Sequence, residues 1–404
     1  MDIERLLGRL PAPVTDRLLD TAAGRGWSGR ILNRFLGLRG HASVPALPPR
    51  SDAAVRIAIG PANTVEQAYL WCRAWEFSDP EASALSIMID GSPRLRTDIR
   101  VPRAIAAGDR DWQRSLEALL SERTHVIQES GRAFLGGLHD ADPFRELAHL
   151  RRSGVAVGVL FHGSDIRDPA AHLQREKHSP FADPGVPTVL LRRKALRNRR
   201  RARDLGAPVF VTTPDLLLDV PEAHWCPVTI DVERWASPGR SGESARVIVA
   251  HAPSNGVLKG SDLIDPVLGR LDAEGLITYR RVEGVAPEAM PAVYADADIV
   301  VDQVRMGLYG AASAEAMAAG AVAVAHVSEQ VREVVRERSG RELPVVQAVP
   351  EDLEDVIRRL AADAALRGDL RRRGSEFVTA VHSGPFSVRT LADALDGTAP
   401  VTKN

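Results

Sequence analysis

A lysine in a loop of small and polar residues is the first residue whose setting indicates chemistry. Lys259 lies in HAPSNGVLKG, residues 251–260, after the apolar run RVIVA and before a helical pattern that begins at Ser261. Glycine and small polar residues let the backbone approach a ligand and present its N–H groups. Ser261 could cap the helix, whose N-terminus carries partial positive charge. The arrangement predicts a phosphate site, and an exposed lysine in an ordinary strand-to-helix turn fits the segment equally well.

A second glycine-containing loop runs into a helix of small residues. The segment VRMGLYGAASAEAMAAG, residues 304–320, places Glu315 in the second helical turn among alanines. A carboxylate at this point can accept hydrogen bonds from two vicinal hydroxyls, such as those of a ribose. The alternative is a surface glutamate, but alanine-rich helices are usually packed tightly, and an unpaired carboxylate is costly there. We therefore predict that Glu315 binds a ligand.

A histidine follows an apolar strand pattern in the first half of the chain. His162 opens the segment HGSDIR directly after the run VAVGVLF. One interpretation is a strand end at which Asp165 and Arg167 pair locally. The other places His162 in a cleft, with Asp165 and Arg167 as wall or acceptor contacts. We favour a functional role for His162 and leave the other two residues open.

Strand patterns that alternate with helical patterns must position these residues. The expected strands are residues 53–59, 85–89, 124–128, 155–161 and 208–212 in the first half, and residues 246–251, 277–282, 298–302 and 321–326 in the second. Such alternation predicts two parallel sheets flanked by helices. The linker PGRSG, residues 238–242, separates the two series. Ligands of parallel sheets bind beyond the carboxyl ends of strands, which is where all three segments fall.

Helix starts and the closing helices complete the expected pattern. Thr64 with Gln67 three residues later resembles a capping box, and Thr213 before Pro214 resembles a second capped start. Two further helices are expected at residues 351–365 and 387–395.

Composition limits the class of protein. The chain has 404 residues, 44% hydrophobic and 26% charged, which is typical of a soluble globular protein with at least two domains. A net charge of −1 argues against recruitment of nucleic acid by the overall field. The two cysteines lie far apart in the sequence and favour a reducing compartment. The start MDIERLLGRLPAP lacks an apolar signal core, so we expect a cytoplasmic protein.

The combination of motifs resembles a known family. HAPSNGVLKG, VEGV, YADADIVVDQ and GLYGAASAEAMAAGAVAVAH are similar to the second half of GT-B glycosyltransferases, most of all glycosyltransferase family 4, whose members are retaining and use nucleotide sugars. VLFHGSDIR and TTPDLLLDVPEAHWCPVTIDVERW are similar to the last strands of that family's acceptor half. In outline the resemblance spans residues 53–395, and its sharp motifs lie between residues 246 and 327.

The resemblance implies an α/β fold of the GT-B type, in which two Rossmann-like doubly wound domains face each other across a cleft. The expected parts are a helical extension at residues 1–50, an acceptor domain at 51–228, a nucleotide-sugar donor domain at 229–385 and a helix at 386–404 that packs back on the first domain.

The resemblance also implies roles for individual residues. Lys259, His162 and Glu315 are the expected catalytic residues, with Lys259 on the diphosphate, Glu315 on the ribose and His162 beside the transferred sugar. The expected diphosphate contacts are Ser254, Asn255, Gly256, Lys259, Tyr309 and Gly310. The expected ribose and base contacts are Glu315, Glu283, Gly284 and Val285. The expected donor-sugar and acceptor contacts are Gly60, Asn63, His162, Asp165, Asp302 and Gly307.

Two positions depart from the family pattern. Gly307 stands eight residues before Glu315, where the family has a glutamate that contacts the donor sugar, and Asp302, Gln303 or the backbone of residues 307–310 could replace it. Pro253 stands where many relatives have an arginine, so Arg305 or another residue would have to supply a second cation. These departures keep open a non-catalytic GT-B protein that binds nucleotide sugar or a partner, and the fold also serves epimerases and phosphorylases.

The leading hypothesis is a retaining glycosyltransferase that moves a sugar from a nucleoside-diphosphate sugar to a hydroxylated acceptor, either a cell-surface glycan, a glycolipid or a natural product. No Asp-x-Asp motif lies in a suitable loop, so neither a metal nor another cofactor is expected. The basic segment at residues 190–205 fits the solvated face of an amphipathic helix. The alternative is peripheral contact with the inner membrane face. The segment has too few aromatic residues to favour nucleic acid. Sugar, acceptor and oligomeric state stay open.

Overall fold

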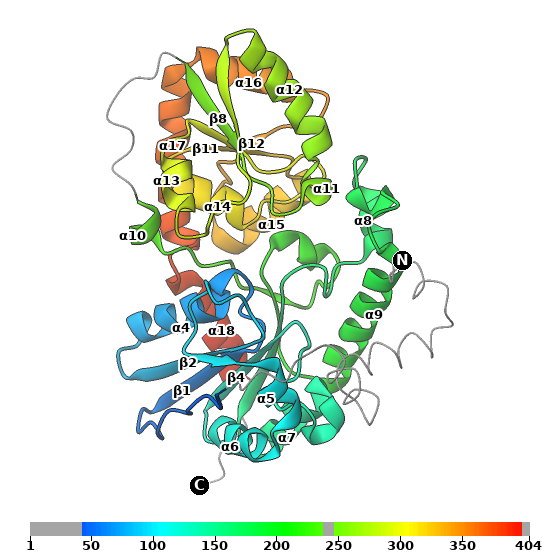
Figure 1. Cartoon of the computed structure of the whole chain (residues 1–404), viewed down its shortest axis with the longest axis vertical. Helices are drawn as coiled ribbons and strands as arrows, with labels where there is room; N and C mark the ends of the chain where they lie inside the picture. Colours follow the sequence, from blue (N-terminus) through cyan, green and yellow to red (C-terminus); the bar gives the residue numbers. More distant parts are fainter. Residues whose placement is uncertain (1–42, 237–245, 398–404) are drawn as a thin grey trace.

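Two parallel sheets, one in each half of the chain, form the framework of the molecule. The computed structural model describes residues 43–236 and 246–397. Figure 1 shows the two halves stacked along the long axis, with the first half below and the second above. All strand pairs in both sheets are parallel. The predicted α/β architecture with two doubly wound halves is therefore confirmed.

The first sheet has seven strands in the order β3-β2-β1-β4-β5-β6-β7. Its strands are β1 (Val55–Gly60), β2 (Ala82–Ile89), β3 (Ile99–Val101), β4 (His125–Glu129), β5 (Ala156–Phe161), β6 (Val209–Val211) and β7 (His224–Trp225). The central strands β4 and β5 are buried along their whole length, because helices cover both faces of a parallel sheet. Their register pairs His125 with Ala156 and Glu129 with Leu160.

Helices and short 3-10 turns connect these strands. They are η1 (Thr64–Glu66), α4 (Gln67–Ser78), α5 (Arg103–Gly108), α6 (Arg110–Ser121), η2 (Leu138–Ala141), α7 (Pro143–Arg152), α8 (Pro169–Arg175), η3 (Pro180–Ala182), α9 (Thr188–Leu205) and η4 (Pro214–Leu218). Local sequence explains several starts. The Asp142 carboxylate accepts from two backbone N–H groups of α7, and proline occupies the first position of that helix, where its missing N–H costs nothing.

The second sheet has five strands in the order β12-β11-β10-β8-β9. Its strands are β8 (Val247–His251), β9 (Ile277–Arg281), β10 (Ile299–Val301), β11 (Val322–Ala325) and β12 (Val346–Gln347). Its helices are α11 (Gly256–Lys259), α12 (Ser261–Ala273), α13 (Met290–Ala295), α14 (Ala311–Ala318), α15 (Glu329–Ser339), α16 (Leu353–Ala362) and α17 (Ala364–Val381). The short helix α10 (Val232–Trp235) lies between the two sheets in sequence.

The last helix, α18 (Pro385–Asp396), returns to the first half. Figure 1 shows it passing from the end of α17 down to α4. Its buried residues Val388, Leu391 and Leu395 belong to the same apolar cluster as Trp71 of α4 and Phe210 of β6. The predicted return of the C-terminal helix is therefore confirmed.

Three local expectations were wrong. Thr64 begins a 3-10 turn and does not cap α4, because Val65 and Glu66 take left-handed conformations. Thr213 likewise precedes η4 without a side-chain cap. Ser261 is already inside α12, since Gly260 is the residue before that helix, and its hydroxyl bonds the ring of His251. The long helix α17 was missed altogether, because its pattern is basic and weakly periodic.

The helical extension predicted for residues 1–50 lies almost entirely outside the described residues, as do the linker at 238–242 and the end of the 386–404 segment. Among the residues that the structure describes, no helix has the length and apolar character needed to cross a bilayer.

Candidate active site

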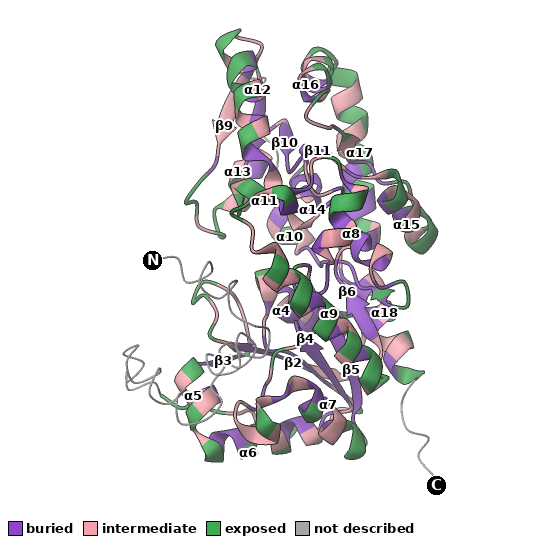
Figure 2. Cartoon of the chain, turned by 90° about the vertical axis from the view of Figure 1, so that its right-hand side faces the viewer, coloured by how far each residue is buried: buried purple, intermediate pink, exposed green. Residues whose placement is uncertain are grey.

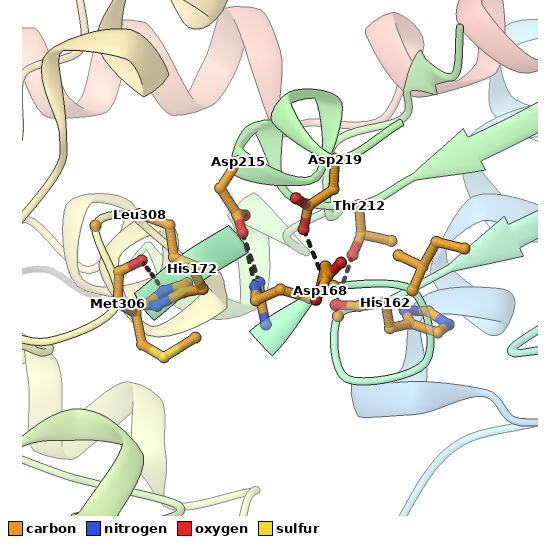
Figure 3. Close-up of polar contacts among 12 residues, drawn as sticks. His162, Asp168, His172, Thr212, Asp215, Asp219, Met306 and Leu308 are labelled. Atoms are coloured by element: carbon orange, nitrogen blue, oxygen red, sulfur yellow. Dashed lines mark hydrogen bonds and ion pairs between the residues drawn. The ribbon is translucent and has the colours of Figure 1, made fainter. Parts of the chain in front are cut away.

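The carboxyl ends of both sheets carry the predicted site residues. In the first half, Gly60 ends β1, Glu129 ends β4 and His162 follows β5. In the second half, His251 ends β8 and Asp302 follows β10. The halves touch at these edges. Figure 3 shows His172 of the first half pointing at Met306 of the second, where Nε2 lies 3.2 Å from the carbonyl oxygen.

The loop after β8 folds into a single helical turn. Asn255 caps this turn, α11, by accepting from the backbone N–H of Leu258, and Lys259 is its last residue. Gly260 then takes a left-handed conformation with φ 78°, and a Cβ there would lie 2.8 Å from Val304. Ser254 and Gly256 lie on the same loop, with Ser254 exposed. The turn thereby fixes Lys259 beside the loop that follows β10.

Lys259 points at a buried carboxylate. Its ammonium forms an ion pair with Asp302 Oδ1, and Ser313 of α14 donates to Asp302 Oδ2 at 2.7 Å. Burial raises the pKa of Asp302, but Lys259 and the Ser313 hydroxyl outweigh it and hold the pKa below its usual value. Asp302 was predicted to contact the donor sugar or acceptor. Here both of its oxygens are used within the protein, where they tie Lys259 to the first turn of α14.

Helix α14 presents an uncapped N-terminus at the same edge. Gly310 precedes it without a side-chain cap, so its first backbone N–H groups have no side-chain acceptor. The neighbouring Tyr309 was predicted to contact the diphosphate. Its side chain is buried, with the hydroxyl 3.2 Å from His382 Nε2, so only its backbone faces the loop.

Glu315 lines a pocket between the two halves. The pocket also involves Glu66 and Arg96 from the first half and Arg234 of α10. Glu315 has no hydrogen-bond partner among the described residues. Burial raises its pKa from 4.5 to about 7, against the opposing charge of Lys259. An incompletely satisfied carboxylate that faces a pocket is suited to accept hydrogen bonds from hydroxyl groups of a ligand.

His162 is held by a carboxylate that the sequence did not single out. Its Nε2 lies 2.8 Å from Glu129 Oε1, and its ring stacks on Trp71 with a centroid distance of 6.0 Å. Glu129 Oε2 accepts from the backbone N–H groups of Ala62 and Asn63, at 3.0 and 2.6 Å. Glu129 therefore joins the first loop to His162. Its only sequence signal is its position at the end of an apolar strand.

Two predicted contact residues use their side chains inside the protein. Asn63 is fully buried, and its amide donates to the Arg96 carbonyl at 2.7 Å. Asp165 accepts from the backbone N–H groups of His162 and Gly163 and is only 3% exposed. Both residues shape loops at the edge of the first sheet. Gly60 is needed for packing, because a Cβ would meet the Ile87 carbonyl at 2.3 Å.

The turn predicted to contact the base lies open after β9. Glu283, Gly284 and Val285 are all exposed, and Gly284 has φ 68°. Glu283 pairs with Arg281 at 2.8 Å. Gly307 lies in the loop between β10 and α14, with φ 64°, and faces the carboxylate of Glu176.

Among the described residues, one group could hold a metal ion: Glu117, His139 and His149, whose ligand atoms lie within 4.8 Å of one another. It joins α6, η2 and α7. Glu117 Oε1 lies 2.6 Å from His139 Nε2 and 3.4 Å from His149 Nε2, so a carboxylate–imidazole link already accounts for the contact. These residues do not belong to the edge that carries Lys259 and His162.

Comparison with known proteins identifies a family model that matches part of the second half. A family model described as glycosyl transferase-like matches residues 260–392, the part that holds α12, α14 and Glu315. No curated protein matches the chain in sequence.

Solved structures share the two-domain architecture. An alpha-glucosyltransferase in complex with UDP and a 13-mer DNA has a TM-score of 0.54 and 14% identity, covering 84% of this chain and 99% of that chain. The Anabaena protein HepE, solved with UDP and glucose, has a TM-score of 0.52 and 10% identity, covering 85% and 99%. Sucrose-phosphate synthase from Thermosynechococcus elongatus has a TM-score of 0.50 and 14% identity, covering 85% and 99%. The chain has the GT-B fold, and its second half is glycosyl transferase-like.

Proposed function

We propose that the chain is a retaining glycosyltransferase of the family 4 type, which transfers a sugar from a nucleoside-diphosphate sugar to a hydroxyl group of an acceptor. The observation that carries this proposal is the arrangement at α14. Lys259 is tied through Asp302 to the first turn of α14, and Glu315 lies in the next turn of the same helix. A cation and free N–H groups for phosphate thus stand one helical turn from a carboxylate suited to ribose hydroxyls.

Departure of the nucleoside diphosphate is the step that these groups would assist. Negative charge develops on the leaving phosphate, and Lys259 with the N-terminus of α14 would stabilise it. Asp302 holds the ammonium in place before the ligand arrives, and the diphosphate then shares or displaces this partner. We propose that no metal is required, so that excess EDTA leaves transfer unchanged.

The first half would orient the acceptor and the transferred sugar. His162 lies at the facing edge, and Glu129 fixes its ring by bonding Nε2. In a retaining reaction the acceptor attacks the face from which the phosphate leaves, and a leaving-phosphate oxygen takes the acceptor proton. His162 then acts by position, not as a nucleophile. Closure of the two halves would exclude the water that otherwise hydrolyses the donor.

A ligand panel followed by a transfer assay tests this function. Thermal unfolding is measured with UDP, GDP, UDP-glucose, UDP-N-acetylglucosamine and GDP-mannose. A ligand at 100 times its dissociation constant adds about 2.7 kcal/mol of stability. We expect one nucleotide series to stabilise the protein and its sugar to be transferred with retained anomeric configuration. Absence of stabilisation by every nucleotide would contradict the proposal.

A non-catalytic nucleotide-sugar-binding protein is the second candidate, because the cations near the loop already have partners. Lys259 pairs with Asp302, and Arg305 pairs with Asp262 at 2.7 Å. Binding of a nucleotide sugar without hydrolysis or transfer across a panel of hydroxylated acceptors would favour this alternative.

The exposed face of α9 is the proposed site of any peripheral membrane contact. Its exposed residues follow a helical spacing: Val189, Arg192, Arg193, Leu196, Arg197, Arg200, Arg203 and Asp204. Figure 2 shows exposed residues along this helix. The simpler interpretation is a solvated basic face. Sedimentation with liposomes that contain or lack anionic lipid distinguishes the two, and no pelleting with anionic lipid ends the membrane proposal.

A further inference from the structure

A carboxylate from the first half fills the space beside Gly307. An added Cβ at Gly307 would lie 2.1 Å from Glu176 Oε1 and 2.4 Å from its carboxyl carbon. Gly307 also has φ 64°, a conformation that L side chains rarely adopt. A side chain at this position would require the Glu176 carboxylate to move, in addition to the strain of the backbone conformation. The glycine therefore makes room in the second half for a side chain that the first half supplies.

Glu176 has one side-chain partner, His326, and one carboxylate oxygen without a hydrogen bond among the described residues. Its Oε2 lies 2.7 Å from His326 Nε2. The Gln347 amide lies 2.9 Å from His326 Nδ1 and donates to it, so the ring proton must be on Nε2 and is donated to Glu176. Among the described residues, no hydrogen bond reaches Glu176 Oε1. Glu176 is only 8% exposed, so this oxygen is an acceptor held in a largely enclosed place.

The segment that carries Glu176 holds the loop before α14 at two points. His172, one helical turn earlier, bonds the carbonyl of Met306 (Figure 3). Glu176 lies against Gly307. Burial lowers the pKa of His172 to about 4, so its ring is neutral at physiological pH. The contact of Glu176 with this loop thus joins the two halves at the carboxyl edge of the second sheet.

We propose that Glu176 contacts the hydroxyl groups of the donor sugar, as a specificity-determining residue supplied across the cleft. This inference rests on the proposed function. Gly307 is three residues before Gly310, which precedes the α14 N-terminus assigned to the diphosphate. A sugar bonded to the terminal phosphate must lie within a few ångströms of that N-terminus. A carboxylate beside Gly307 is a strong acceptor for sugar hydroxyls.

The placement has a consequence for donor binding. The nucleotide site of Lys259 and Glu315 belongs to the second half, whereas Glu176 belongs to the first. A nucleoside diphosphate can therefore bind without Glu176, but the sugar reaches its carboxylate only when the halves are together. The sugar is therefore recognised only when the cleft closes. This coupling favours closure around an intact nucleotide sugar over closure around the nucleoside diphosphate alone.

Paired ligands separate this role from a simple contact between the halves. Dissociation constants are measured by calorimetry for UDP and UDP-glucose, or for GDP and GDP-mannose if the panel selects guanine. For Glu176→Gln we expect the nucleotide sugar to bind at least about tenfold more weakly and the nucleoside diphosphate to change less than about twofold. Glu351→Gln is the matched control, because Glu351 pairs with Lys177 and His178 across the same boundary between the halves. It should bind both ligands as wild type does.

Moving the carboxylate from position 176 to position 307 gives a second test. Glu176→Ala removes the carboxylate and opens space at Gly307, and Gly307→Glu in that background returns a carboxylate from the other half. We expect the double variant to recover part of the affinity for the nucleotide sugar. Equal binding of the sugar nucleotide by wild type, Glu176→Gln and Glu176→Ala overturns the inference while leaving the proposed function intact. A wild type that binds no nucleotide at all removes both.

Discussion

At the scale of single residues, the proposed chemistry depends on charges that the fold already holds in place. Lys259 and Asp302 form a pair in which the carboxylate is buried, and the Ser313 hydroxyl satisfies the second oxygen. Burying one charge without its partner is costly, because no water replaces the lost ion. The pair therefore holds the lysine in place. Its ammonium can still bind an incoming diphosphate, because the diphosphate offers a stronger set of acceptors than Asp302 does.

Lys259→Ala should reduce both the rate of sugar transfer and the free energy of unfolding. A second substitution should restore the stability without restoring the transfer. The single variant leaves Asp302 buried without its cation, which costs about 3 kcal/mol. Adding Asp302→Asn removes that buried charge and should restore most of the free energy of unfolding, measured in urea. Transfer should stay about 10² to 10³ below wild type in both variants. Near-normal transfer by the double variant would show that Lys259 does not stabilise the leaving phosphate.

Glu315→Gln should stabilise the ligand-free protein at high pH and weaken nucleotide binding. Burial raises the folded pKa of Glu315 from 4.5 to about 7. Its contribution to stability is therefore complete below pH 4.5 and is lost as pH rises through about 7. The glutamine variant should exceed wild type by about 2 kcal/mol at pH 8 and by much less at pH 5. Urea unfolding at both values checks this, and an equal difference at both would contradict it.

At the scale of elements, Gly384 allows the start of α18 to pack closely against α4 of the first half. Gly384 stands before α18 with φ 113°, and an added Cβ would lie 2.5 Å from the Cβ of Ala74 in α4. The close approach lets the buried side of α18 pack against α4. The helix that follows α17 is thereby anchored on the domain opposite to the one it leaves.

Gly384→Ala should destabilise the protein by about 3 kcal/mol, from the sum of left-handed strain and overpacking. Gly154→Ala is the matched control, because Gly154 also has a positive φ, of 91°, but no atom lies within 4 Å of an added Cβ. It should cost only about 1–2 kcal/mol for the backbone strain. Equal losses in the two variants would show that the contact with Ala74 is unimportant.

At the scale of the whole molecule, a buried histidine joins the two halves. His382 lies between α17 and α18, where Nδ1 bonds the Val228 carbonyl at 2.7 Å and Nε2 meets the Tyr309 hydroxyl. Its carbonyl accepts from the backbone N–H of Ile230. Burial lowers the pKa of His382 from 6.5 to about 4, so the ring is neutral near pH 7, donates from Nδ1 and accepts at Nε2 from the Tyr309 hydroxyl. His382 thereby connects Tyr309 of the second half to residues 228–230, which follow the last strand of the first sheet.

Mild acid should therefore destabilise wild type more than His382→Ala. The folded pKa is below the unfolded one, so the contribution of His382 is present above pH 6.5 and is lost as pH falls through about 4. Between pH 7 and pH 5, the loss of unfolding free energy should be about 1–2 kcal/mol smaller in the variant. Urea unfolding at both values measures it. An identical pH dependence in the two proteins would mean that folding does not lower the pKa of the His382 ring.

Much of the secondary structure and sheet arrangement follows from the local sequence pattern. Apolar runs of strand length alternate with helical spacing, and this alternation alone predicted two parallel sheets and the sheet edges at which ligands are expected to bind. Lys259 and Glu315 were singled out in this way, because each lies in the loop or helix that follows such a run. Pieces with weak periodicity, such as α17 and the short strand β12, gave no comparable signal.

Only the tertiary structure decided which side chains meet. Glu129 and His162, Lys259 and Asp302, and Glu176 and Gly307 are each far apart in the sequence, and no local spacing brings them together. Ion pairs and close packing depend on how two separate chain segments are oriented, whereas strand and helix patterns depend on neighbours within a few residues. The sequence by itself determined the two halves and the sheet edges at which a ligand is expected to bind. The folded chain alone placed a carboxylate of one half in the space left by a glycine of the other.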